Sequence, residues 1–126
     1  MLFRSGPLAR RVAADPGGEA RHLAAALAEG DPLAARIVAE VAGDLAFGLS
    51  HAMHLFHPDV IVLGGGLSGL GEPLRAAVAN GLKGFLMEAL VPTIDVRLTA
   101  LGADVVPVGA LLLAADRLAG VAQTRR

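Results

Sequence analysis

A glycine-rich segment is the strongest candidate for chemistry in this sequence of 126 residues. The segment consists of Gly64, Gly65, Gly66, Leu67 and Ser68. It follows the apolar, β-branched run 59–63, which is typical of a buried strand. A glycine turn at this place brings backbone N–H groups to the edge of a sheet, where a phosphate or nucleotide can approach without meeting a Cβ. A tight turn that needs positive φ explains the same glycines equally well.

Two known phosphate-binding patterns do not fit this segment. It has no Gly-Lys-Ser/Thr, and no acidic residue ends a second strand about 20 residues after Gly64. Asp104 is a second polar candidate, because it precedes an apolar helical segment. We interpret it as the N-cap of that helix, or alternatively as a polar group facing a nucleotide pocket. No paired carboxylates, Ser-His-Asp set or reactive lysine stands out, so no catalytic residue is predicted.

Three histidines follow one another at steps of three: His51, His54 and His57. Such steps turn by about 60° each on a helix, so His51 and His54 could share a metal ion, whereas His57 is expected past the helix end. No carboxylate in the same turn completes a metal site. We therefore predict no metal centre and interpret the histidines as polar groups that bond to backbone near a sheet.

Composition excludes several classes of protein. The chain is 54% hydrophobic, has a formal net charge of -1 and contains no cysteine. Disulfide scaffolds and cysteine-ligated zinc are excluded, and the missing basic stripe argues against direct contact with nucleic acid. The charge-free runs are short and interrupted, and 1–7 lacks a signal-peptide pattern, so a soluble, cytoplasmic protein is expected. The mean hydropathy of +0.58 then implies apolar surface that a partner covers.

Hydrophobic periodicity and breakers predict an α/β protein with helices packed on a small, incomplete sheet. Helices are predicted over 5–14, 19–29, 32–56, 72–86 and 105–118, and strands over 59–63 and 94–99. The predicted division is an N-terminal helical segment (1–30), a main lobe (31–120) and a frayed tail (121–126).

Individual residues indicate where the predicted helices begin and how the helices and strands pack. Ser5 can cap the first helix, while Asp31 and Pro32 fit the N-cap and N1 positions of the long one. Gly43 and Gly48 cost helix propensity and are expected to allow close packing. The first strand is expected to be buried on both faces and the second to have one wet face.

The stretch from Gly30 to Gly120 resembles the C-terminal part of the ROK family, which groups sugar kinases such as bacterial glucokinases with sugar-responsive repressors. Four segments carry the resemblance: the helix start Gly30-Asp31-Pro32-Leu33-Ala34, the run His57-Pro58-Asp59-Val60-Ile61-Val62-Leu63-Gly64-Gly65-Gly66-Leu67-Ser68, the closing element Leu101-Gly102 with Asp104 and Gly109-Ala110, and Ser5-Gly6-Pro7-Leu8. The second segment is the most specific of the four.

The resemblance implies that this chain is most of one lobe of an actin-like ATPase (ribonuclease H-like) fold, in which two lobes clasp ATP, with Mg²⁺, and a sugar. It implies that Gly64–Ser68 lies along the nucleotide, with the turn from Asp104 nearby. The family's phosphate-binding motif, catalytic carboxylate and zinc loop would all precede Met1. Where the family has Ala-Gly after this aspartate, Val105 and Val106 stand here, and they are expected to crowd a nucleotide pocket.

The leading functional hypothesis is the C-terminal part of an ATP-dependent hexose kinase, with glucose as the expected sugar, inactive when alone. The alternatives are the sugar-sensing end of a ROK-type repressor, and a non-catalytic remnant or self-association module. The expected partners are an N-terminal lobe or second subunit, a hexose bound by the complete protein, and further copies of the chain in a homo-oligomer.

Overall fold

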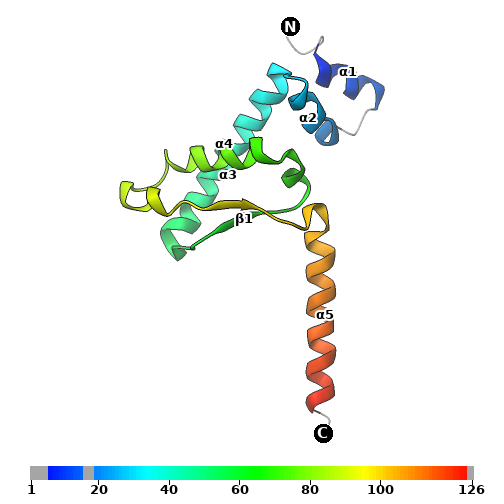
Figure 1. Ribbon diagram of the computed structural model, residues 1–126, viewed down its shortest axis with the longest axis vertical. Coiled ribbons are helices and arrows are strands. Elements are labelled where there is room, and N and C mark those ends of the chain that lie inside the picture. Colours follow the sequence, from blue (N-terminus) through cyan, green and yellow to red (C-terminus); the bar gives the residue numbers. More distant parts are fainter. Residues whose placement is uncertain (1–5, 16–18, 125–126) are drawn as a thin grey trace.

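The computed structural model describes residues 6–15 and 19–124 and is mostly helical with one small sheet (Figure 1). The elements run in the order α1 (Pro7–Ala14), α2 (Glu19–Ala28), α3 (Pro32–Phe56), β1 (Ile61–Leu63), η2 (Gly66–Leu70), α4 (Glu72–Leu82), η3 (Glu88–Thr93), β2 (Val96–Leu98), η4 (Gly102–Asp104) and α5 (Val105–Thr124), where η marks a 3-10 helix. The predicted order of helices and strands is confirmed. The predicted cap Ser5 lies outside the described residues.

The sheet consists of β1 and β2, which pair in parallel. Ile61 stands beside Val96, and Val62 stands beside Arg97. Because side chains alternate along a strand, Val62 and Arg97 share one face of the sheet, and both are exposed. The wet face predicted for the second strand is confirmed. The prediction that the first strand is buried on both faces is wrong, since Val62 is 58% exposed: within the described chain, α3 and α4 cover only the other face.

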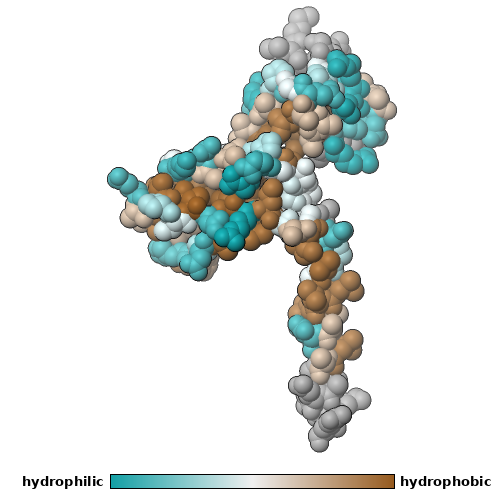
Figure 2. Space-filling model, viewed as in Figure 1, coloured by the Kyte–Doolittle hydropathy of each residue, from teal (hydrophilic) through white to brown (hydrophobic). Residues whose placement is uncertain are grey.

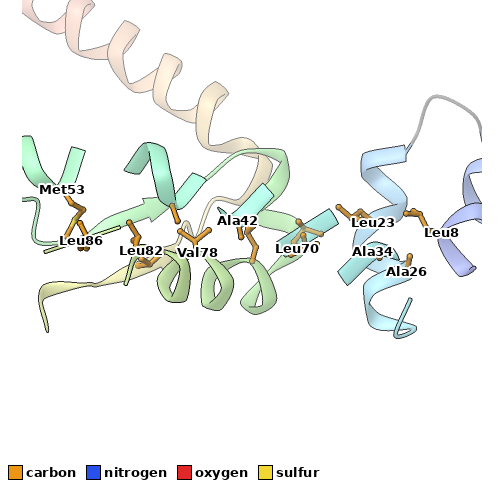
Figure 3. Packing of buried hydrophobic residues seen from close by; sticks show 14 residues of the cluster. Leu8, Leu23, Ala26, Ala34, Ala42, Met53, Leu70, Val78, Leu82 and Leu86 are labelled. Atoms are coloured by element: carbon orange, nitrogen blue, oxygen red, sulfur yellow. The ribbon is translucent and has the colours of Figure 1, made fainter. Parts of the chain in front are cut away.

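The core lies mainly between α3 and α4 and continues toward α1 and α2 (Figure 3). Ala42 and Ala46 of α3 face Val78 and Leu82 of α4 across this contact, and all four are buried. Gly81 lets the two backbones approach closely: a Cβ built there would lie 2.8 Å from the Ala46 Cβ. Small residues on both helices therefore set the distance between α3 and α4.

The prediction that Gly43 and Gly48 allow close packing is wrong. A Cβ at Gly43 or Gly48 would meet no atom within 4 Å, so neither glycine is required by a neighbour in the described chain. The glycine that allows close packing between α3 and α4 is Gly81, which belongs to α4.

One carboxylate caps two helices. Asp31 is 2% exposed and is the N-cap of α3, where its Oδ1 accepts from the Leu33 N–H (2.8 Å). Its Oδ2 accepts from the Leu8 N–H in the first turn of α1 (2.8 Å). α1 has Gly6 as its own N-cap, and a Cβ there would lie 2.6 Å from Asp31 Oδ2. The aspartate of α3 thus takes the place of the missing cap of α1.

α5 leaves the body of the protein and points away from α1 and α2 (Figure 1). It continues to Thr124 and so is longer than predicted, including part of the expected frayed tail; residues 125–126 are outside the described chain. Its leucines are 60% to 73% exposed, and they form a brown band in Figure 2. No helix within the described ranges combines the length and apolar character needed to cross a bilayer.

The α3–α4 contact predicts opposite effects for two Gly→Ala substitutions. Gly81→Ala should lower the free energy of unfolding by about 1–3 kcal/mol, because its methyl group forces the helices apart. Gly43→Ala should raise it by about 1 kcal/mol, because alanine is the better helix former and the space is open. Urea unfolding followed by circular dichroism measures both. Equal effects of the two substitutions would contradict the packing described.

The double cap predicts a specific acid sensitivity. Backbone hydrogen bonds, first that from Leu8, lower the pKa of the Asp31 carboxyl below its ordinary value of 3.8. A lowered folded-state pKa means that this stabilisation is present above pH 3.8 and is lost as the pH falls from there through the folded-state value. Asp31→Asn should lower the Tm at pH 7 and flatten the acid limb of a Tm-against-pH curve. An acid limb identical to that of the unmodified chain would contradict the role of Asp31.

Candidate functional site

The glycine-rich turn begins where β1 ends and leads into η2. Gly65 has φ +85° and Gly71, at the end of η2, has φ +67°. Side chains rarely adopt these angles, so at these two positions glycine is required by the turn itself. Gly66 and Gly69 have no such requirement, and a Cβ at either would meet no atom within 4 Å. The open space beside these two glycines is what makes the turn accessible to a ligand.

Ser68 holds the turn closed. Its Oγ donates to the Gly65 carbonyl oxygen (2.6 Å), and its N–H donates to the same oxygen (3.0 Å). The side chain is buried. The Ser68 hydroxyl is therefore hydrogen-bonded within the turn, and the buried side chain stabilises the turn.

Gly64 packs against the start of α5. A Cβ at Gly64 would lie 3.3 Å from Val105 Cγ1 and 3.5 Å from Thr99 Cγ2. Of the two valines, Val105 therefore lies against Gly64, whereas Val106 is 73% exposed. That they crowd a nucleotide stays a prediction.

Asp104 lies near the glycine turn, because η4 packs against η2. Its side chain is exposed. Asp104 directly precedes α5, which is the position expected of its N-cap: the 3-10 turn Gly102–Asp104 runs into α5, and the Asp104 N–H bonds to the Leu101 carbonyl oxygen (3.0 Å). Its part in capping α5 or in facing a nucleotide stays a prediction.

An open hollow of about 560 Å³ lies between α2 and the glycine turn. The described residues that line it are Arg21, Ala24, Gly66, Leu67, Gly69 and Leu70. Of the predicted site residues the hollow brings together Gly66 and Leu67, and it leaves Gly64, Gly65, Ser68 and Asp104 outside its lining. Arg21 and Ala24 were missed by the sequence analysis, because a single arginine on an alanine-rich helix carries no motif.

Two of the three histidine side chains, those of His51 and His54, bond to backbone groups, as predicted. His51 Nδ1 lies 2.9 Å from the Phe47 carbonyl oxygen, and the Met87 N–H donates to His54 Nε2 (3.4 Å). His57 is the left-handed C-cap of α3, past the helix end as predicted. Within the described ranges, no three histidine or carboxylate side chains gather in a way that could hold a metal ion.

Apart from Asp31, the described groups with shifted pKa values lie in two arginine–carboxylate pairs at the surface. The Arg97 guanidinium hydrogen-bonds to Asp95 and lowers the pKa of that carboxyl. Arg75 does the same for Glu72, and one of its nitrogens also donates to the Val96 carbonyl oxygen (3.3 Å). The bond from Arg75 to Val96 joins α4 to β2. None of the four charged residues is among the described residues that line the hollow.

Comparison with known proteins identifies the class to which this parallel α/β unit and its glycine turn belong. The sequence model of the ROK family matches residues 8–117, and the chain belongs to the ROK family. It is 30% identical to a glucokinase from Thermotoga maritima over 102 residues, which are 81% of this chain and 32% of the glucokinase. It is 36% identical over 61 residues to an uncharacterised protein of Clostridium perfringens, covering 48% of this chain and 21% of that protein. The chain thus spans about a third or less of the length of these relatives.

The contact between Gly64 and Val105 predicts coupled substitutions. Gly64→Ala should lower the free energy of unfolding by about 1 kcal/mol, because its methyl group presses on Val105. In a Val105→Ala background the same substitution should cost less, with a coupling of about 0.5–1 kcal/mol. The matched control is Gly66→Ala, whose effect should be the same in both backgrounds. Denaturant unfolding of the double-mutant cycles measures both couplings, and additivity at Gly64 would contradict the contact.

Proposed function

We propose that this chain is the C-terminal part of a ROK-type, ATP-dependent hexose kinase that phosphorylates glucose, acts in the cytoplasm and has no activity as the isolated chain. The observation that carries the proposal is its match to a glucokinase over 81% of the chain, a region that includes the glycine turn. The open hollow beside that turn gives the proposal a physical site.

We also propose that the chain forms part of a larger, actin-like ATPase fold. Two features support it: within the described residues the sheet has two strands with one face open at Val62, and α5 projects from the body beyond its first turn (Figure 1) with its leucines exposed. Leucines along a helix are normally buried against a neighbour. We propose that an N-terminal lobe or a second subunit covers these surfaces, that this lobe supplies the hexose contacts and the catalytic carboxylate, and that the assembled protein is a homo-oligomer.

The lining of the hollow fits the nucleoside part of ATP. Gly66 and Gly69 leave room that a Cβ would occupy, and Leu67 offers an apolar surface that is 40% exposed. The described part of the lining contains no carboxylate, and the described residues gather no metal-ligating cluster. The described residues therefore do not fit Mg²⁺, and we assign this chain no role in holding it.

The proposal predicts that the chain binds ATP but does not turn it over with glucose. Gly66→Leu should weaken ATP binding about tenfold or more, because the added side chain fills open space at the hollow. Gly48→Leu, also in open space but on α3, is the matched control and should leave binding unchanged. Isothermal titration measures binding, and a coupled assay of ADP release measures turnover.

Two results would contradict the proposal in different ways. Glucose-dependent ATP turnover by the isolated chain would show that it is a complete enzyme. Absence of ATP binding to the folded, unsubstituted chain would remove the nucleotide site from this segment.

A further inference from the structure

The last turn of α4 contains the pair Asn80-Gly81, and Asn80 is the only asparagine of the chain. An asparagine followed by glycine can react with its own backbone, because glycine has no Cβ to hinder the approach of its nitrogen to the side-chain amide. Asn80 is exposed, whereas Gly81 lies against Ala46 of α3. A reactive side chain is thus directly joined to the glycine that sets the distance between the two helices.

Lys83 is placed to assist such a reaction. Its Nζ donates to the side-chain carbonyl oxygen of Asn80, Oδ1 (3.1 Å). When a nitrogen attacks the amide carbon, negative charge develops on that same oxygen, and a cation bonded to it stabilises the charge. The long, flexible lysine side chain can keep this bond while the backbone moves. Because both groups are exposed, water screens the interaction and the assistance is modest.

The intact helix protects the pair. In a helix the Gly81 N–H belongs to the ladder of backbone hydrogen bonds, and its nitrogen cannot turn toward the Asn80 side chain. The end of α4 is nevertheless weak, because glycine is a poor helix former and the turn that follows, at 83–85, is exposed. The buried side chain that holds this turn is Leu82, which lies between α3 and α4 (Figure 3). Local opening of the last turn is therefore the step that permits the reaction.

We propose that Asn80-Gly81 is a self-modification site, at which opening of the last turn of α4 permits deamidation and Lys83 stabilises the charge that develops. The Gly81 nitrogen attacks Asn80 Cγ and closes a succinimide ring, and the side-chain nitrogen leaves as ammonia with the proton of the Gly81 N–H. Water then adds to either ring carbonyl and breaks a C–N bond of the ring, which gives aspartate or isoaspartate at position 80. Water is the only co-reactant, and the site does not depend on the proposed kinase function.

The two products act differently on the α3–α4 contact. Isoaspartate adds a methylene group to the backbone directly before Gly81, so α4 can no longer hold this glycine against Ala46. Aspartate leaves the backbone unchanged. Its ion pair with Lys83 offsets the unfavourable position of a carboxylate near a helix C-terminus. Conversion to isoaspartate should therefore loosen the contact, whereas conversion to aspartate should preserve it.

The intact mass of the full 126-residue chain, followed during incubation at mildly alkaline pH, tests the site. We expect the mass to rise by the exchange of a carboxamide for a carboxyl group. Asn80→Gln is the matched control, because ring closure from glutamine is slower, and its mass should stay constant over the same time. An equal gain in this variant would assign the change to a glutamine and overturn the proposal.

Lys83→Gln should slow the deamidation about two- to fivefold, the range expected of one exposed charged contact. Lys83→Arg keeps the cation and should retain most of the rate. If Lys83→Gln reacts as fast as the unsubstituted chain, Lys83 does not stabilise the developing charge, and that part of the proposal is wrong.

Leu82→Ala tests the opening of the turn. Loss of this buried side chain should raise the rate about tenfold or more, because the last turn opens more often. Leu111→Ala is the matched control, since Leu111 lies exposed on α5, and it should leave the rate unchanged. Equal rates in these two variants would contradict the role of the turn.

The unsubstituted chain in increasing urea gives the same information if Leu82→Ala does not fold. The rate should rise with urea below the unfolding transition and reach its maximum in the unfolded chain. A rate that urea does not change would show that the helix gives no protection. If the unfolded chain reacts and the folded chain does not, the turn stays closed and the proposal is also wrong.

The products are distinguished by enzymatic methylation, which labels isoaspartate and not aspartate. The isoaspartate-containing chain should unfold at lower urea than Asn80→Asp, which carries the aspartate product on an unchanged backbone. Equal unfolding midpoints would contradict the predicted effect on the α3–α4 contact.

Discussion

The carboxylate of Asp31 is the interaction on which the N-terminal half of the structure depends. It bonds to the first turns of both α1 and α3, which are separated in sequence by α2. α2 packs against both of these helices, whose starts are held at one carboxylate, and it also contacts η2. Since α2 is one wall of the hollow, this buried cap positions a candidate binding surface more than 30 residues away in the sequence.

The apolar surface follows from a different constraint, the small size of the sheet. Two parallel strands with helices on one face leave the other face open, and parallel sheets are normally covered on both faces. α5 adds to this surface, because three consecutive leucines at 111–113 span about 200° of the helix, and the residues on either side of them, at 109–110 and 114–115, are glycine and alanine. Such a helix needs neighbours around it, which explains why the mean hydropathy is high for a chain with so little core.

The features that the sequence predicted correctly are those set by neighbouring residues. Asp31 before Pro32 predicts the start of α3, and Pro58 predicts its end at His57. Alternation along 94–99 predicts the wet face of β2. Each of these signals depends on residues that are close together in the sequence, so it can be interpreted without knowing the rest of the fold.

The features that the sequence could not predict depend on residues far apart along the chain. Helix propensity gives Gly43 and Gly81 the same cost, and only the crossing of α3 and α4 shows that Gly81 is the one in contact. The second bond of Asp31 and the place of Arg21 beside the glycine turn arise in the same way. The exposure of Val62 has another cause, because the run 59–63 carries the pattern of a strand covered on both faces, whereas the described chain covers one.

The glycine turn shows both what the local sequence predicts and what contacts between distant residues add. From sequence, a nucleotide site and a tight turn explain its glycines equally well. In the structure each explanation applies to different residues: Gly65 and Gly71 have positive φ, Gly64 packs against Val105, and Gly66 and Gly69 border open space. A turn alone requires the first two glycines, and packing requires the third. The last two are required by neither, and their openness is the part of the motif on which the proposed nucleotide site rests.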